Sequence, residues 1–364
     1  MNKLIYTLLL FLTLSIASYA QSNNVELLIN EGIALHDSTE YKLAIEKFES
    51  ALKLNPKSTL ALYEISLSYL ELKEYESASQ YSTRVIEAND ETLLIGAYAV
   101  KSEALVGLDR IDDAILILRE GLSKIGESFL LHFNLALNYY KKNDINKTLE
   151  HVNRAIELDK NFSGAFLLSA YAQRDKGLWL QSIYSFQMFL LLEPDSSRSR
   201  NAFEEMLQAM SIIDTSTEKP VERSFIQMQM SKNKSAEEDK SVAETPTTGM
   251  DSIRENLSIK INQTIDSIQG DSETLDYYVA FKEVNKIILD GLSDQNEDTT
   301  MTDNFWGFKY PFFTSILNSN YYDVFCRYIS VSYFPESLQW WEENQTEAQN
   351  FINWFEKGED NSSN

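Results

Sequence analysis

Histidine and cysteine, the residue types most often used as metal ligands and nucleophiles, number only three and one in this chain. The histidines His36, His132 and His151 fall in three different predicted helices, so a shared metal site is not expected. The single cysteine, Cys326, stands among apolar neighbours, which favours a buried thiol over a reactive one. These residues therefore predict neither a metal ligand set nor a catalytic residue.

Three further motifs bear on catalysis or ligand binding. The acidic run from Asp294 to Asp298 begins like a calcium loop, but Thr299 replaces the required glycine and Phe305 replaces the closing glutamate. The chain has no glycine-rich phosphate loop and no Gly-x-Ser-x-Gly elbow. We accordingly expect a protein that is not an enzyme and that carries no cofactor.

Acidic residues dominate the charge of the 364-residue chain. Asp and Glu number 55 against 32 Lys and Arg, which gives a formal net charge of −23. A surface of this sign repels the phosphates of nucleic acids and of anionic lipids, so neither is an expected partner. With one cysteine there is no intramolecular disulfide, and stability must come from packing.

The first residues have the pattern of a cleavable signal peptide. Lys3 supplies a positive charge, Leu4–Ile16 is an apolar run, and Ala20 ends a small-residue cleavage site. An uncleaved membrane anchor is the alternative, but the run is short for a membrane span. We expect removal of residues 1–20 and a soluble, exported protein, in a bacterial periplasm or otherwise secreted, with no integral membrane span.

A repeated pattern with a period close to 34 residues organises the next part of the chain. The small or short residues Ala44, Ala78, Ala114, Thr148 and Ser182 are separated by 34, 36, 34 and 34 residues. Around the first of them, Tyr41, Phe48 and Ala51 stand at helical spacing from Ala44, and Pro56 ends the helix. Repeats of this length predict paired helices that bury their faces against one another.

These residues resemble the signature of the tetratricopeptide repeat (TPR) family, whose period is 34 residues. The resemblance implies an all-α fold: a helical-hairpin solenoid of five repeats, a flexible linker and a small helical C-terminal domain. The predicted repeats are Val25–Ser58, Thr59–Thr92, Ile95–Ser128, Phe129–Phe162 and Ser163–Ser196. Small residues at Gly32, Ser66, Ser102, Ala136 and Ala170 should let the two helices of each repeat approach closely. An amphipathic helix at Asn201–Ile213 should cap the solenoid, so that residues 21–213 form one domain.

The composition changes after residue 213. Residues 214–249 are rich in Thr, Ser, Glu and Lys and predict a flexible linker. Helical spacing then predicts helices over Met250–Ile268 and Ser272–Asp290. Residues 303–357 hold 17 of the 43 aromatic residues, which favours an aromatic core for a helical domain over 250–357, followed by a disordered tail at 358–364. The stretch from Phe305-Trp306 through Trp354-Phe355 is similar to the C-terminal part of some exported bacterial TPR proteins.

In the TPR family the first helices of the repeats line a concave groove that binds peptides or proteins. The resemblance therefore implies a non-catalytic scaffold or adaptor of the cell envelope that binds a protein or peptide. The positions that face the groove in the family correspond here to Ile33, Tyr63, Leu67, Phe133, Leu137, Tyr140 and Tyr171. Because these side chains are mainly apolar, an apolar or amphipathic segment is the expected ligand.

Three alternatives to this function remain open. The C-terminal domain could itself occupy the groove. The aromatic residues of that domain could instead form a polysaccharide-binding surface, or the domain could hold an enzyme site.

Overall fold

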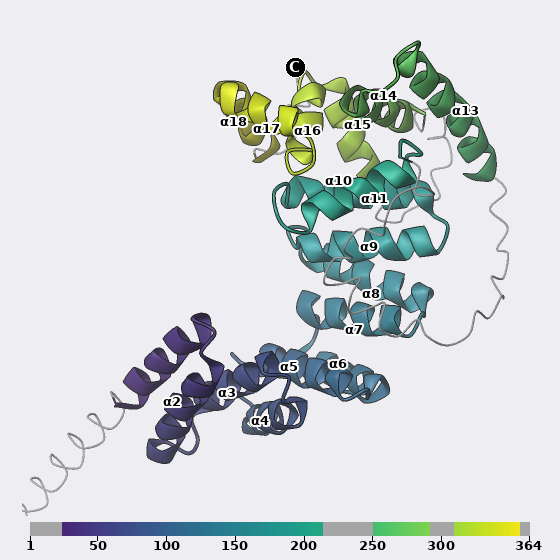
Figure 1. The fold of residues 1–364 in the computed structure, drawn as a ribbon. Coiled ribbons are helices and arrows are strands. Elements are labelled where there is room, and N and C mark those ends of the chain that lie inside the picture. The colour runs from purple at the N-terminus through teal and green to yellow at the C-terminus, as the bar shows by residue number, and fades with distance from the viewer. Residues whose placement is uncertain (1–23, 214–249, 292–308, 357–364) are drawn as a thin grey trace, which may run out of the picture. The chain divides into compact units, whose positions relative to one another are not determined.

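The computed structural model describes residues 24–213, 250–291 and 309–356 (Figure 1). The predicted signal peptide, the linker at 214–249, the calcium-like run that starts at Asp294 and the tail at 358–364 lie outside the described residues. All the regular secondary structure in the described ranges is helical, as the all-α prediction requires. None of the described helices has both the length and the apolar character needed to cross a bilayer.

Two compact units make up the chain, Met1–Leu158 and Asp159–Asn364. Unit 1 contains the first four helical hairpins. Its described helices are one over residues 24–37, α2 (Tyr41–Leu54), α3 (Thr59–Glu71), α4 (Tyr75–Ala88), α5 (Leu94–Gly107), α6 (Ile111–Ile125), α7 (Phe129–Lys141) and α8 (Ile145–Leu158). The predicted period therefore corresponds to one hairpin per repeat.

Every hairpin turns through one residue in the left-handed conformation. These residues are Thr39, Lys73, Asp109, Asn143 and Gly177, with φ between 59° and 80°. The residue after each donates its N–H to the carbonyl five positions earlier at 2.8 to 2.9 Å, as Glu40 does to Leu35. This Schellman geometry satisfies the last carbonyls of the first helix. Since only Gly177 is a glycine, the turns do not appear in the sequence as a glycine repeat.

Close approach of paired helices explains the small residues of the repeat. Gly32, Ser66, Ser102, Ala136 and Ala170 are all buried, which confirms their predicted packing role. A Cβ atom added at Gly32 would lie 2.4 Å from the Phe48 ring, so the ring occupies the space that a side chain would need. Repeats one and two share a core in which Phe48, Ala61 and Ile65 are fully buried.

Unit 2 contains the fifth hairpin, the predicted cap and the C-terminal helices. Its described helices are α9 (Ser163–Asp175), α10 (Trp179–Leu192), α11 (Ser199–Ala209), α13 (Met250–Gln269), α14 (Tyr277–Asp290), α15 (Tyr310–Asn318), α16 (Tyr322–Ile329), α17 (Pro335–Glu343) and α18 (Gln345–Glu356). Helix α14 starts at Tyr277 and not at Ser272, because the Asp276 side chain caps it by accepting the Val279 N–H at 3.0 Å.

Helix α10 is the central element of unit 2. Its residues from Ser182 to Leu191 are all buried, as expected for a helix that is apolar on every side. It packs against α9, α11 and α16, and the ring of Tyr184 meets Phe313 of α15 edge-on at 5.2 Å. The Gln187 amide donates to Asn285 of α14 at 2.8 Å. The C-terminal helices thus share one core with the fifth hairpin, whereas the sequence predicted a domain boundary after residue 213.

Aromatic side chains fill much of this core. Phe281, Phe313 and Phe325 are fully buried, and Phe351 is 1% exposed. Phe203 of the predicted cap contacts Phe281 at 4.9 Å in an edge-to-face arrangement. The aromatic density of the C-terminal sequence is therefore used largely for packing.

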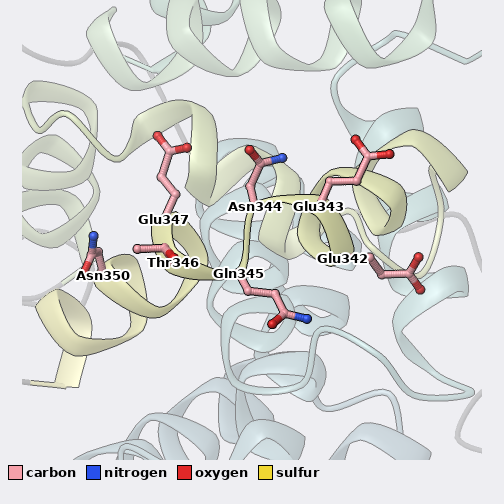
Figure 2. A pocket seen from close by; sticks show the side chains of 7 residues that line it. All are labelled: Glu342, Glu343, Asn344, Gln345, Thr346, Glu347 and Asn350. Carbon is pink, nitrogen blue, oxygen red and sulfur yellow. The ribbon is translucent and has the colours of Figure 1, made fainter.

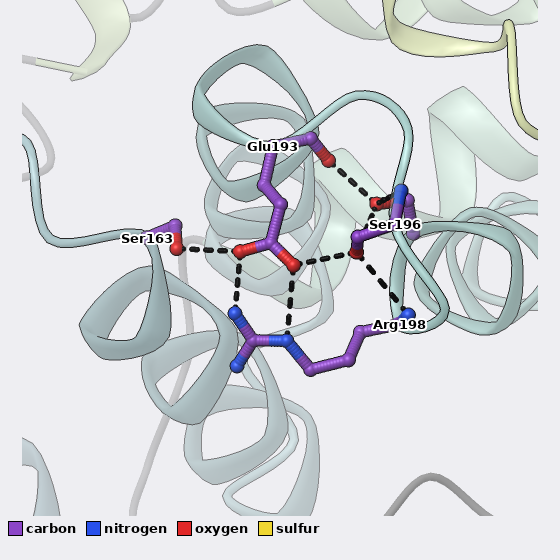
Figure 3. Close-up of polar contacts among 5 residues, drawn as sticks. Ser163, Glu193, Ser196 and Arg198 are labelled. Atoms are coloured by element: carbon purple, nitrogen blue, oxygen red, sulfur yellow. Dashed lines mark hydrogen bonds and ion pairs between the residues drawn. The ribbon is translucent and has the colours of Figure 1, made fainter. Parts of the chain in front are cut away.

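A charged cluster joins the end of α10 to the starts of α9 and α11 (Figure 3). Arg198 Nε donates to Glu193 Oε1 at 3.0 Å, and a second guanidinium nitrogen contacts Oε2. Ser163 and Ser196 donate their hydroxyls to the same carboxylate at 2.7 and 2.5 Å. Burial acts to raise the pKa of Glu193, but the hydrogen bonds from Arg198, Ser196 and Ser163 lower it overall. These contacts hold the connection between α10 and α11 against the start of α9.

Candidate protein-interaction face

Three consecutive first helices of unit 1 each leave one face unburied. On α3 this face carries Leu60, Tyr63, Leu67 and Leu70; on α5, Gly96, Ala99, Glu103 and Val106; on α7, Leu130, Phe133, Leu137 and Tyr140. The spacing of 3, 4 and 3 residues is the same in each helix and places each set along one side. We call these twelve residues the α3–α5–α7 face. Large apolar side chains thus line the two outer helices.

The middle helix carries small residues between those two. Helix α5 packs against α3 and against α7. A Cβ atom added at Gly96 would lie 2.4 Å from the Tyr63 hydroxyl oxygen, so the tyrosine side chain lies over the backbone of α5. Ala99 adds only a methyl group. The result is a strip of small side chains flanked by leucine and aromatic side chains.

Buried polar contacts hold the first helices in register. Asn138 Nδ2 of α7 donates to Ser102 Oγ of α5 at 3.0 Å, and both residues are buried. His36 Nδ1 lies 2.9 Å from Ser68 Oγ, which links the helix over 24–37 to α3. Because a buried polar group without a partner is costly, such pairs favour one alignment of neighbouring helices.

Carboxylates accompany the apolar side chains of this surface. Burial, and then the negative charge of Asp37, raise the pKa of Glu64. Desolvation also raises the pKa of Glu103; Lys141 opposes this shift and Glu71 adds to it. Desolvation lowers the pKa of Lys141, with Glu103 acting in the opposite direction. The accessible surface of Glu103 is that of an exposed residue, yet neighbouring protein atoms displace part of the water around its carboxylate. This combination is typical of a side chain in a surface hollow.

The seven groove residues predicted from the sequence do not share one environment. Tyr63, Leu67, Phe133, Leu137 and Tyr140 belong to the α3–α5–α7 face and are half-buried. Ile33 is also half-buried and packs against the core of the first two repeats.

Tyr171 differs from the other six predicted residues. It belongs to unit 2 and is only 1% exposed, with its ring edge-on to Phe186 at 5.6 Å. A ring buried to this extent has no surface to offer a partner. The candidate face therefore excludes Tyr171.

A histidine pair is the feature that the sequence did not predict. His132 of α7 and His151 of α8 place their Nδ1 atoms 3.0 Å apart, and His132 Nε2 lies 3.1 Å from Glu127 Oε2. Tyr139 stacks on His151 with the two rings parallel within 1°. Among the described residues, no three or more His, Cys, Asp or Glu side chains are grouped to hold a metal ion. The pair is thus a hydrogen-bonded contact inside the fourth hairpin.

Two further features of unit 2 are the buried Cys326 and a pocket among the C-terminal helices. Burial is the main cause that raises the pKa of Cys326 to about 12, which keeps the thiol protonated and confirms the buried cysteine. A pocket of about 590 Å³ lies where α17 meets α18 (Figure 2). Its lining consists of Glu342, Glu343, Asn344, Gln345, Thr346, Glu347 and Asn350. This lining offers no aromatic ring on which a sugar could stack.

Comparison with known proteins identifies the repeat. Residues 60–92, which span α3 and α4, match the family model described as "Tetratricopeptide repeat". The TPR repeat-containing protein MJ1428 of Methanocaldococcus jannaschii is 23% identical over 129 residues. The aligned stretch is 35% of this chain and 22% of that relative.

Similar solved structures cover about half of this chain. TTC0263, a thermophilic TPR protein of Thermus thermophilus, is 20% identical with a TM-score of 0.44, over 51% of this chain and 99% of its own. PilW, a type IV pilus biogenesis factor, is 15% identical with a TM-score of 0.45, over 52% of this chain and 86% of its own. Repeat solenoids of this kind serve as scaffolds for protein interaction. Residues 60–92 thus form a tetratricopeptide repeat, and the described part of the chain contains five helical hairpins of the same period.

Proposed function

We propose that this protein is a non-catalytic scaffold of the cell envelope that binds an apolar or amphipathic segment of another protein on the α3–α5–α7 face. The observation that carries the proposal is the pair of parallel apolar stripes on α3 and α7, with small residues of α5 between them. Leucine and aromatic side chains left half-buried in this way favour contact with apolar groups over contact with water. The envelope location rests on the signal-like pattern of residues 1–20.

The size of the stripes is sufficient for a specific complex. Fully burying one large apolar side chain contributes roughly 1.5 to 3 kcal/mol. Because Phe133 and Leu137 are already half-buried, each can gain about half of that on binding. The binding free energy from several such contacts exceeds the entropic cost of ordering a short segment, and the dissociation constant is then of about micromolar order.

Replacement of the α7 stripe tests the proposal. Full-length protein is used to capture partners from the native envelope, and the affinity of one purified partner is then measured for Phe133→Ala/Leu137→Ala. We expect at least about a tenfold loss, which corresponds to about 1.4 kcal/mol. Leu116→Ala/Leu158→Ala is the matched control, because these leucines are 61% and 38% exposed on second helices of the same unit.

The control variant should bind within about twofold of the wild type. Circular dichroism must first show that both variants keep their helical content. Full affinity of the folded Phe133→Ala/Leu137→Ala variant would mean that the partner binds elsewhere.

A further inference from the structure

Four carboxylates accompany the α3–α5–α7 face: Glu103 is one of its twelve residues, and the other three lie on the first helices beside it. Asp37, Glu71 and Glu103 occur at the ends or the middle of successive first helices, and Glu64 lies beside Tyr63. None of these four carboxylates forms a salt bridge with a described residue. Elsewhere in unit 1, acids such as Glu31 and Asp112 are paired with lysines.

The position of Glu103 within its repeat shows where the negative charge lies relative to the apolar stripes. Counted from the start of its repeat it corresponds to Leu67 of α3 and Leu137 of α7, so a carboxylate replaces the apolar residue on the middle helix. Since α5 packs between α3 and α7, the charge lies between the two apolar stripes. The nearby cation, Lys141, interacts with Glu103 through space but is not within salt-bridge distance among the described contacts.

A carboxylate in such a hollow is poorly solvated, and a cation supplied by a ligand compensates it well. The raised pKa values of Glu64 and Glu103 report that loss of water. A hydrogen bond to a charged group is about twice as strong as one between neutral groups, and it strengthens as water is excluded. An apolar ligand without a cation would bury these charges unpaired, which is unfavourable.

We propose that the segment bound by the α3–α5–α7 face is basic and amphipathic, with apolar residues against the α3 and α7 stripes, one Lys or Arg directed at Glu103 and another directed at Glu64. This inference rests on the proposed function and names the chemistry of the partner. The occupant is a segment of another protein in which cationic and apolar side chains alternate along one helix face. Charge complementarity selects it over acidic or purely apolar segments.

Two model peptides test the inference with the full-length protein. The first is a fluorescein-labelled amphipathic helix of Leu and Lys, about 16 residues long so that it can form a helix. The second has the same pattern with Glu in place of Lys. Fluorescence anisotropy should show binding of the Leu–Lys peptide and at least about tenfold weaker binding of the Leu–Glu peptide. Equal affinities for the two peptides would overturn the inference.

Matched neutral variants separate this face from the general acidity of the protein. Glu64→Gln/Glu103→Gln should weaken the Leu–Lys peptide by at least about fivefold. Glu46→Gln/Glu87→Gln removes two exposed acids from the second helices α2 and α4 and should change the affinity by less than about twofold. If the two double variants lose affinity equally, the peptide is held by net charge alone and the inference is wrong.

The apolar variant of the same face distinguishes the two proposals. If Phe133→Ala/Leu137→Ala weakens the Leu–Lys peptide while Glu64→Gln/Glu103→Gln does not, the face binds apolar segments without charge selection. The proposed function then stands and the inference falls. If neither variant weakens the peptide, the face is not the binding site and both are wrong.

Discussion

The carboxylate of Glu193 links three helices of unit 2. We expect its negative charge to contribute more to the stability of this unit than the size of the side chain does. Glu193→Gln keeps the size of the side chain but replaces one oxygen with an amide nitrogen, which faces the Arg198 guanidinium as a second donor (Figure 3). The hydroxyls of Ser163 and Ser196 keep at most a neutral acceptor. We expect the variant to fold and to be less stable in unit 2.

The size of the expected loss in unfolding free energy depends on how exposed Glu193 and Arg198 are. The side chains of Glu193 and Arg198 are 22% and 32% exposed, so solvent screens the pair only partly. Hydrogen bonds to charged groups contribute about 1.5 to 3 kcal/mol, whereas fully exposed ion pairs contribute about 0 to 1 kcal/mol. An intermediate loss of about 2 kcal/mol is expected. For a unit of this size it lowers the melting temperature by about 4 to 8 °C.

Tryptophan fluorescence is a selective assay for this effect. All five tryptophans lie between Trp179 and Trp354, so thermal unfolding followed by tryptophan emission reports unit 2 and not unit 1. Glu343→Gln serves as the control. Its carboxylate accepts one exposed hydrogen bond, from Gln339 at 2.9 Å, and the melting temperature should change by less than about 2 °C.

The pH dependence of the same melts checks the cause. Because the folded state lowers the pKa of Glu193, the ionised carboxylate stabilises unit 2 above its ordinary pKa of about 4.3. That stability is lost as the pH falls through the lower, folded-state pKa. The difference between wild type and Glu193→Gln should therefore be largest near neutral pH and shrink below about pH 4.3. A melting temperature for Glu193→Gln equal to that of the wild type at pH 7 would refute the reasoning.

Two further predictions concern buried polar pairs. Gln187→Leu leaves Asn285 without its buried donor and should destabilise unit 2 by about 1 to 3 kcal/mol in urea unfolding followed by tryptophan emission, whereas Gln187→Leu/Asn285→Leu should recover much of that loss. A double variant no more stable than the single one would contradict this. Burial, and then the charge of His132, lower the pKa of His151 below about 6.5, which NMR titration of the three histidines can measure. Since the folded state then binds fewer protons than the unfolded state, unit 1 should lose stability as the pH falls below about 6.5, and His151→Gln should reduce that loss. An unshifted His151 titration would remove the basis for this expectation.

The helices and their period were accessible from the sequence because each depends on nearby residues. The spacing from Ala44 to Ser182 predicts five hairpins, and the described residues 24–192 form five. The predicted helix over Met250–Ile268 agrees with α13 (Met250–Gln269). Errors occur at helix ends, as at α14, where a side-chain cap at Asp276 outweighs the apolar pattern. The left-handed hairpin turns were missed because residues other than glycine adopt them.

The candidate face was predictable in part. Family positions place Tyr63, Leu67 and Phe133 toward the groove on first helices, and the structure leaves all three half-buried. Tyr171 has the same position in its repeat as Leu67 but is buried in unit 2. The sequence gives no sign of this difference, because the position of a residue within its repeat does not say which other helices cover it.

The sequence by itself determined the repeat period, the apolar face of each helix, the acidic charge and the absence of a disulfide, since these follow from residue types and short-range spacing. Only the tertiary structure decided which faces meet. It brought His132 to His151 across a hairpin and Gln187 to Asn285 across 98 positions of the chain. It also surrounded α10 completely, while α3, α5 and α7 kept one face unburied. The physical reason is that an apolar stripe lowers its free energy against any complementary surface, and the choice among such surfaces depends on the packing of the whole chain.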